Sequence, residues 1–311
     1  MSLQNQRIAY GEALVELGKQ NKNVVALEAD LGKSTMSYLF GEAFPDRYFE
    51  MGIAEQNMAS VAAGLSVVGK IPFIHSFAVF ASGRAYDQIR QSIAIPGLNV
   101  NICGSSSGLS DFGDGSTHQA IEDVAIMQAI PNMTVLVPAD AVETRQMVFA
   151  MAELSGPCYI RINRNDLPVY TNDEPFVVGK MNVVKQGTDV AIFANGVMVS
   201  KALRAAEILE AGGISAKVIN ASTVKPMDPC HAAQLAEGMK AVVTAEEHTV
   251  VGGLGAAVSL ALQGRVHVPV LYVGIKDCFG TSAHSYDELL THYGLTENEI
   301  VEAAKKGRMM V

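Results

Sequence analysis

Glu55 is the residue whose setting most clearly suggests chemistry. It stands in the segment GIAEQ, and the alanine-rich, apolar stretch that follows predicts a helix over residues 55–68. One interpretation is an exposed carboxylate in the first turn of a helix, where the helix dipole stabilises it. Gly52 and Ile53 before it and the apolar helix after it favour burial instead. A carboxyl group removed from bulk water can share a proton with a ligand, which is acid–base chemistry.

Histidines and glycine clusters are the next candidates. A lone histidine is usually structural, and only His118, in the segment GDGSTHQ, stands in a motif that suggests more. The segment Gly252-Gly253-Leu254-Gly255 lacks the spacing of a dinucleotide-binding fingerprint, so we predict a closely packed helix start there. The remaining histidines are interpreted as structural or surface residues: His75, His231, His248, His267, His284 and His292.

The elements that must position these residues alternate between strand-like and helix-like segments, which is typical of parallel α/β domains. One expected helix covers residues 85–95. The composition changes over residues 171–188, which predicts a linker and an edge strand. The sequence therefore predicts an α/β fold with two three-layer parallel-sheet domains, over residues 1–170 and 189–311.

Composition limits the classes of function. The net charge of −9 argues against a nucleic-acid binder, because phosphate backbones require a basic surface. No stretch is long and apolar enough to span a membrane. The cysteines form no CxxC pair, so we expect buried free thiols in a reducing compartment and a cytoplasmic protein. They are Cys103, Cys158, Cys230 and Cys278.

Several segments resemble the C-terminal half of transketolase, and the resemblance covers almost the entire chain. The more specific ones are FEMGIAEQNMASVAAGL (49–65) and GDGSTHQAIEDVAIMQAIPNMTVLVPAD (113–140). LEADLGKS (27–34), RINRNDLPVY (161–170), NASTVKPMD and VVTAEEHTVVGGLG agree with them. The resemblance implies a pyrimidine-binding domain followed by the C-terminal domain of that family.

The resemblance also implies a cofactor, thiamine diphosphate. In the family, the glutamate of GIAEQ, here Glu55, hydrogen-bonds to the pyrimidine N1′ atom and stabilises the tautomer whose imino nitrogen removes the C2 proton. Phe77 and Phe80 match aromatic residues that pack around the pyrimidine, since an aromatic face suits a flat heterocycle. Asp30 is the further cofactor-binding residue that the resemblance implies.

The substrate residues follow from the same resemblance. His118, which is also implied to be catalytic, would hydrogen-bond the ketose carbonyl or its hydroxyls, and Asp114 would recognise the adjacent hydroxyl. The residues at the family's distal phosphate site are Arg7, Ser34 and Arg164, and arginine suits phosphate because its planar fork donates two hydrogen bonds. One position departs from the pattern: transketolases commonly carry a phosphate-binding histidine where this chain has Ser106, so the phosphate site is altered.

The resemblance does not include the part of transketolase that binds magnesium and the cofactor's diphosphate. The Gly-Asp-Gly element at residues 113–115 is not followed by the asparagine pair that would complete a magnesium and diphosphate site, so no metal site is assigned to this chain. We expect Mg2+ to be held by a separate N-terminal, diphosphate-binding subunit. The chain is then one subunit of a split transketolase, a homodimer within a heterotetramer, which transfers a two-carbon ketol unit from a ketose to an aldose, either of which can be a sugar phosphate.

Three alternatives stay open. A deoxyxylulose phosphate synthase also contains GIAEQ and DGxTHQ, and RAYDQ (84–88) resembles its pattern. The beta subunit of a 2-oxoacid dehydrogenase is a separate chain of this size but lacks the DGxTHQ element. A non-catalytic relative that kept the fold is the third, although Glu55, Asp114, His118 and Arg164 together argue against it.

Overall fold

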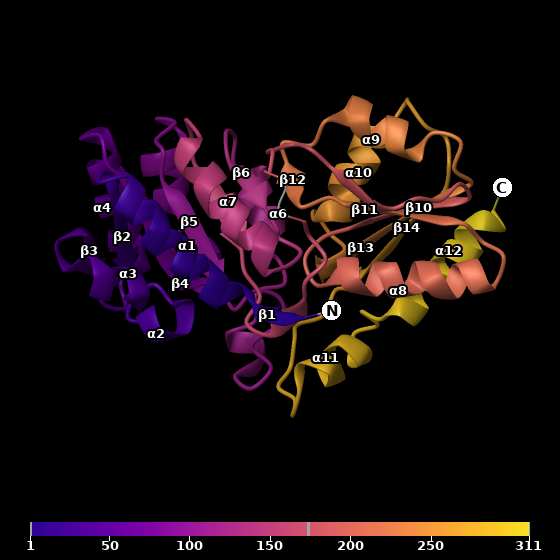
Figure 1. The fold of residues 1–311 in the computed structure, drawn as a ribbon, viewed down its shortest axis with the longest axis horizontal. Coiled ribbons are helices and arrows are strands. Elements are labelled where there is room, and N and C mark those ends of the chain that lie inside the picture. Colours follow the sequence, from indigo (N-terminus) through magenta and orange to yellow (C-terminus); the bar gives the residue numbers. More distant parts are fainter. Residues whose placement is uncertain (1, 173–174, 311) are drawn as a thin grey trace.

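Two α/β lobes lie side by side in the computed structural model, which describes residues 2–172 and 175–310 (Figure 1). The first lobe, indigo to magenta, holds the residues before about 170, and the second, orange to yellow, holds most of the remainder. The predicted α/β class with parallel-rich sheets is confirmed.

The first lobe is built on a seven-stranded sheet. It is parallel except for β12, which pairs antiparallel with β6. β12 comes from the second half of the chain, so the two lobes share a strand connection that the sequence did not predict. The strands in spatial order are β12 (Thr223–Lys225), β6 (Thr134–Leu136), β7 (Cys158–Arg161), β5 (Asn101–Ser105), β4 (Ile71–Phe77), β2 (Val24–Glu28) and β3 (Tyr48–Glu50).

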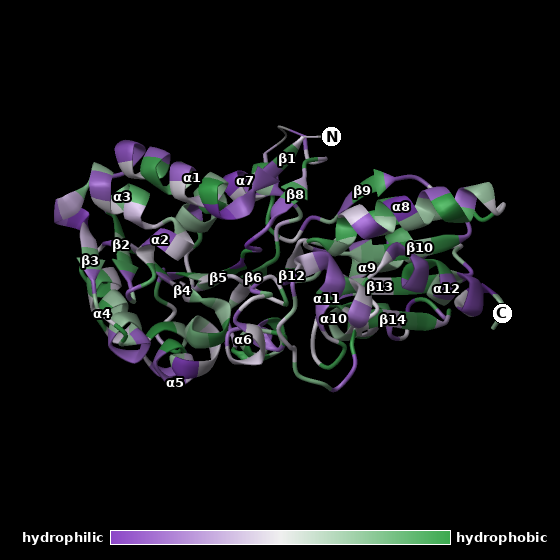
Figure 2. Cartoon of the chain, turned by 90° about the horizontal axis from the view of Figure 1, so that it is seen from below, coloured by the Kyte–Doolittle hydropathy of each residue, from purple (hydrophilic) through white to green (hydrophobic). Residues whose placement is uncertain are grey.

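Helices cover both faces of this sheet, which gives three layers (Figure 2). One face carries α1 (Gln6–Gln20), α3 (Tyr38–Ala43) and α7 (Ala141–Glu153), and the other carries α4 (Glu55–Val67), α5 (Tyr86–Gln88) and α6 (Asp123–Ala129). Each face has its own core of apolar side chains. The short α2 (Gly32–Thr35) follows β2. The helix expected over residues 85–95 is irregular, because π-helical turns at Phe80–Arg84 and Ile89–Ala94 flank α5.

The second lobe repeats the architecture on a five-stranded sheet, parallel except for the edge strand β9. Its strands in order are β14 (Val270–Ile275), β13 (Ala241–Thr249), β10 (Val190–Ala194), β11 (Ala216–Asn220) and β9 (Asn182–Lys185). One face packs on α8 (Met198–Ala211), α11 (Tyr286–His292) and α12 (Glu297–Arg308), and the other on α9 (Pro229–Ala236) and α10 (Leu254–Leu262). β9 lies in the segment predicted as linker and edge strand; residues 173–174 of that segment lie outside the described residues.

A third, two-stranded sheet joins the two ends of the first lobe. β1 (Leu3–Asn5) pairs antiparallel with β8 (Asp166–Pro168), with Asn5 opposite Asp166. The pairing brings Arg7, just after β1, near Arg164, just before β8.

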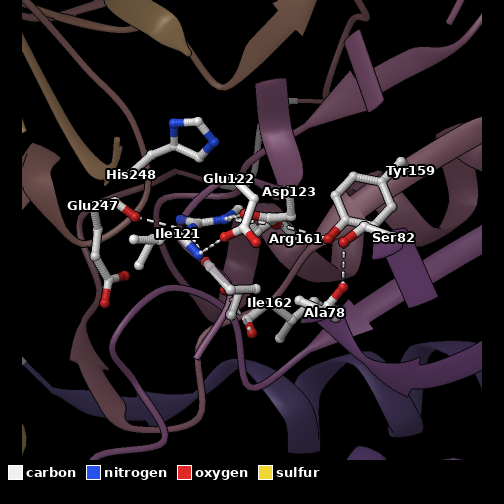
Figure 3. Close-up of polar contacts among 12 residues, drawn as sticks. Ala78, Ser82, Ile121, Glu122, Asp123, Tyr159, Arg161, Ile162, Glu247 and His248 are labelled. Carbon is white, nitrogen blue, oxygen red and sulfur yellow. Dashed lines mark hydrogen bonds and ion pairs between the residues drawn. The ribbon is translucent and has the colours of Figure 1, made fainter. Parts of the chain in front are cut away.

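The junction between the lobes is a network of buried polar groups (Figure 3). The Arg161 Nε at the end of β7 donates to both carboxylate oxygens of Asp123, at 3.0 and 2.9 Å, and its Nη2 donates to the backbone oxygens of Ala120 and Glu247. The Tyr159 hydroxyl donates to the same Asp123 at 2.7 Å. Since Glu247 lies on β13 of the second lobe, this network joins the lobes next to the loop that carries His118.

The prediction of buried thiols is wrong for half of the cysteines. Cys103 and Cys158 are buried and free, but Cys230 and Cys278 are free and exposed. They lie at the start of α9 and after β14, where the chain runs over the surface of the second lobe. No helix among the described residues has the length and apolar character needed to cross a membrane.

Candidate active site

Glu55 is buried at the first position of α4, with 1% of its side chain exposed. Gly52, with a φ of +69°, turns the chain immediately before it. The carboxylate accepts a bond of 2.9 Å at each oxygen from the same Arg84 Nη1, and the Ser76 hydroxyl donates at 3.4 Å. The interpretation of an exposed carboxylate at a helix start is therefore wrong, and the predicted burial is confirmed.

Arg84 connects Glu55 to a group of aromatic rings. Its guanidinium lies 4.5 Å from the centroid of the Phe80 ring. Phe80 stacks on Phe77 with a centroid distance of 6.2 Å and an interplanar angle of 17°. The His118 ring meets both edge-on, at 6.2 Å from Phe77 and 5.4 Å from Phe80. The fold thus brings Glu55, Phe77, Phe80 and His118 together at the carboxyl end of β4.

Sequence reasoning did not name Arg84 as a site residue. RAYDQ, which begins at Arg84, resembles the pattern of deoxyxylulose phosphate synthase but indicates no role for the arginine. Arg84 is the last residue of the π-helical turn Phe80–Arg84, where the residue spacing of an ordinary α-helix does not apply. No spacing rule for an ordinary helix would have found it.

Asp30 lies on a turn that packs against the GIAEQ turn. Its φ is +61°, and its backbone N–H donates to Glu50 Oε1 at 2.8 Å, while the Gly52 N–H donates to the same oxygen at 3.0 Å. The Asp30 side chain is exposed. The structure therefore holds Asp30 beside the start of α4, although it does not bury it with Glu55.

Glu28, at the end of β2, anchors the segment that carries Asp30 and Ser34. Its buried carboxylate accepts hydrogen bonds from the hydroxyls of Thr35, at 2.6 Å, and Ser37. Burial raises the pKa of Glu28 to about 7, and the two hydroxyl donors oppose this rise. The sequence does not indicate this anchoring role, because the hydrogen bonds of Glu28 with Thr35 and Ser37 depend on the fold of LEADLGKS and the residues after it.

Arg7, Ser34 and Arg164 form a second group, and Asp111 joins them. We call these four residues the arginine cluster. Arg7 Nη1 donates to the backbone oxygen of Ser34 at 2.9 Å, and Arg164 Nη1 lies 2.5 Å from the Asp111 carboxylate. The pKa of Arg7 is lowered, first by burial and then by the charge of Arg164. The cluster shows that the predicted residues meet, but with a carboxylate among them that the sequence did not lead us to expect.

The remaining predicted residues lie on the loop between β5 and α6. Asp114 is exposed, at the start of the short turn Gly115–Thr117. Ser106 is buried with a φ of +52°, and its hydroxyl has no hydrogen-bond partner among the described residues. The second lobe holds this loop: Gln119 Nε2 donates to the backbone oxygens of Asp111, at 3.1 Å, and Thr281, at 2.9 Å.

Two other features do not belong to this site. A cavity of about 950 Å3 lies between β14 and α12, lined by Tyr272, His292 and Lys306 among others, and contains none of the predicted site residues. The N-terminus of α10 is filled by Glu246, whose carboxylate accepts from the N–H groups of Leu254 and Gly255. That contact confirms the predicted closely packed helix start and leaves no place for a phosphate.

Comparison with known families shows which family the chain belongs to. Residues 4–169 match the family described as "Transketolase, pyrimidine binding domain", and residues 179–300 match "Transketolase, C-terminal domain". The chain belongs to the transketolase family. Its two lobes correspond to these two domains of a transketolase, in that order.

Several relatives of this transketolase chain are separate chains of similar length. It is 44% identical to a "Putative transketolase C-terminal section" of Methanocaldococcus jannaschii, over 95% of this chain and 94% of the relative. It is 43% identical to a 6-deoxy-6-sulfo-D-fructose transketolase subunit of a Clostridium species, over 96% and 92%. The solved structure of a split-gene transketolase, described as an inactive beta4 tetramer, shares 49% identity and a TM-score of 0.89 over 98% of both chains. The chain therefore corresponds to the C-terminal section of a split transketolase.

Proposed function

We propose that this chain is a subunit of a thiamine-diphosphate-dependent transketolase that transfers a two-carbon ketol unit from a ketose to an aldose. The observation that carries the proposal is the buried carboxylate of Glu55 beside the rings of Phe77, Phe80 and His118. A buried acid next to flat aromatic faces matches the needs of a planar nitrogen heterocycle. Family membership supplies the cofactor that fits this description.

The residues fit the pyrimidine half of that cofactor. Thiamine diphosphate supplies a nucleophilic carbon for the transfer of the ketol unit. Glu55 would hold a proton at the ring nitrogen N1′, and its burial keeps water away from that proton. Phe77 and Phe80 would bind the ring, and Asp30, beside the Glu55 turn, is the further cofactor-binding residue of the proposal.

The sugar would be oriented by the loop between β5 and α6. His118 would donate a hydrogen bond to the sugar oxygen that gains negative charge, a role suited to its place at the edge of both phenylalanines. Asp114, exposed on the same loop, would accept a hydrogen bond from a sugar hydroxyl. Arg7, Ser34 and Arg164 would bind the distal end of the sugar.

We also propose that a second chain completes the site. Exposed apolar side chains stand at both ends of α4: Ile53 is 74% exposed, Val67 71% and Val68 72%. Exposed apolar surface of this kind is typical of interfaces, and Ile53 lies two residues before Glu55. A homodimer of this chain, within a heterotetramer whose N-terminal subunits hold Mg2+ and the diphosphate, would cover them.

The test is reconstitution. The purified chain, given thiamine diphosphate, magnesium and a ketose–aldose pair, is expected to show no transfer, whereas co-expression with the N-terminal subunit restores it. A screen of ketose donors with that complex identifies the sugar. Transfer by the isolated chain would refute the split-enzyme proposal, and a complex that stays inactive with every donor would refute the activity.

A further inference from the structure

The arginine cluster contains a carboxylate in the place where a phosphate site would need positive charge. Asp111 is buried, with 4% of its side chain exposed, and forms an ion pair with Arg164 at 2.5 Å. The backbone of Asp111 is also held, because its carbonyl oxygen accepts a hydrogen bond from Gln119 Nε2. The carboxylate is thus a fixed part of the cluster.

Arg7 is the second cation of the cluster, and one of its donors is unpaired. Its Nη1 is occupied by the Ser34 carbonyl at 2.9 Å, but its Nε is buried and has no hydrogen-bond partner among the described residues. A buried, unpaired donor is costly unless another group satisfies it.

The charges of the cluster decide which acceptor fits. Arg7 and Arg164 contribute two positive charges and Asp111 one negative charge, so a single positive charge remains. The exposed carboxylate of Asp166, which accepts from the Asn5 amide at 2.9 Å, adds further negative potential near Arg7. A phosphate monoester carries a charge of about −1.5 to −2 at neutral pH, so it would have to compete with Asp111 for Arg164.

We propose that Asp111 is a specificity-determining residue, which adapts the distal end of the substrate site to a sugar terminus with no more than one negative charge instead of a phosphate dianion. The proposal rests on the function proposed above. The proposal agrees with the identity of Ser106, which lies on the same loop at the position where the family commonly has a phosphate-binding histidine. The serine lacks the positive charge that a histidine can carry, and Asp111 adds a negative charge to the distal site.

The first test uses the reconstituted complex and three matched aldoses: glyceraldehyde, its 3-phosphate and the corresponding 3-sulfonate. For the unmodified enzyme, kcat/KM for the phosphate should not exceed that for glyceraldehyde by more than about tenfold. Asp111→Asn should raise the ratio of phosphate to glyceraldehyde by about tenfold, mainly through a lower KM for the phosphate. Asp189→Asn, which removes a carboxylate paired with Lys240 in the second lobe, is the matched control and should leave the ratio unchanged.

The second test needs no transfer activity. Inorganic phosphate is titrated into the isolated chain by calorimetry, and Asp111→Asn should bind it about tenfold more tightly than the unmodified chain. Asp111→Ser is the second variant, in case the asparagine variant does not fold. A complex that transfers no sugar while this affinity gain is present would refute the proposed function and leave the proposal on Asp111 standing.

The opposite results overturn the proposal. If Asp111→Asn leaves the phosphate ratio unchanged or lowers it, the carboxylate orients Arg164 for phosphate and does not select against it. Equal affinity of the variant and the unmodified chain for inorganic phosphate would likewise show that Asp111 does not select against phosphate.

Discussion

Two buried carboxylates in the first lobe each face an arginine, and the two pairs differ in what surrounds the arginine. In the Asp123–Arg161 pair, Arg161 is 4% exposed, and its donors also bond two backbone carbonyls. In the Glu55–Arg84 pair, the Arg84 side chain is 44% exposed. Among the described residues, its side-chain contacts are with Glu55 and the Phe80 ring.

The difference separates a structural ion pair from a functional one. Arg161 cannot move without leaving Asp123 and two carbonyls unpaired at the junction of the lobes, which is strongly unfavourable. The Arg84 side chain is half exposed, so water can solvate its guanidinium when it leaves, and the proposed ligand would take its place at the buried Glu55 carboxylate. A buried carboxylate therefore points to chemistry here only when its partner can give way to a ligand.

The largest effect is expected at the functional pair. Glu55→Gln keeps the size of the side chain and a hydrogen-bonding group but removes the acid that we propose holds a proton at the cofactor ring. In the reconstituted complex, turnover should fall by about 10²–10⁴-fold, the range of general acid–base contributions. Urea unfolding of the isolated variant should match the unmodified chain within about 1 kcal/mol, because the partner arginine is half exposed. Normal turnover by the variant would remove Glu55 from the proposed role.

The structural pair should show the reverse pattern. Arg161→Met leaves the Asp123 charge buried without a cation, so the free energy of unfolding should fall by about 3–5 kcal/mol. Arg84→Met is the matched comparison: it also leaves a buried carboxylate without its cation, but it leaves no backbone carbonyl unpaired, so its loss should be smaller than that of Arg161→Met. Urea denaturation of both variants measures the difference, and equal losses would contradict the distinction between the two pairs.

The sequence predicted the architecture well because short apolar runs and helical periodicity are local signals. The two parallel-rich sheets and the edge strand inside the predicted linker follow from it. β12 could not be predicted, because Thr223–Lys225 is a three-residue strand that pairs with β6, far away in the chain. The irregular helix at residues 80–94 escaped prediction for another reason, since an apolar pattern does not distinguish π-helical turns from an α-helix.

The sequence predicted several residues of the candidate site but not the residues that contact or anchor them. Glu55, Phe77, Phe80 and His118 come together as the resemblance implied, because each sits in or beside a motif. Arg84, Asp111 and Glu28 were missed, since each matters through a contact that depends on tertiary structure. Arg164 and Asp111, for example, are 53 positions apart in sequence.

A pH dependence of stability should trace to the structural junction. Burial is the main cause that raises the pKa of Glu247 from 4.5 to about 7, although Arg161 opposes the rise. The folded chain therefore binds this proton more tightly than the unfolded chain, so its contribution is complete below about pH 4.5 and is lost as the pH rises through 7. The loss should be roughly 2–3 kcal/mol.

Urea unfolding of the unmodified chain and of Glu247→Gln between pH 4.5 and 8 measures this contribution. Glu28, whose pKa is also raised to about 7, titrates in both proteins, so the difference between them reports Glu247 alone. A difference that stays constant with pH would show that Glu247 remains ionised in the junction.

The smallest effect is expected where the functional pair must open. The contact of Arg84 with both oxygens of Glu55 competes with the pyrimidine nitrogen for the same carboxylate. In the reconstituted complex, Arg84→Met should therefore lower the apparent KM for thiamine diphosphate by about two- to fivefold, a change of roughly 0.4–1 kcal/mol in binding free energy. Arg90→Met, at an exposed position six residues on, is the matched control and should change nothing. A rise in the apparent KM would show that Arg84 helps to hold the cofactor. Arg84 would then differ from Arg161 in its exposure, but it would not compete with the cofactor for Glu55.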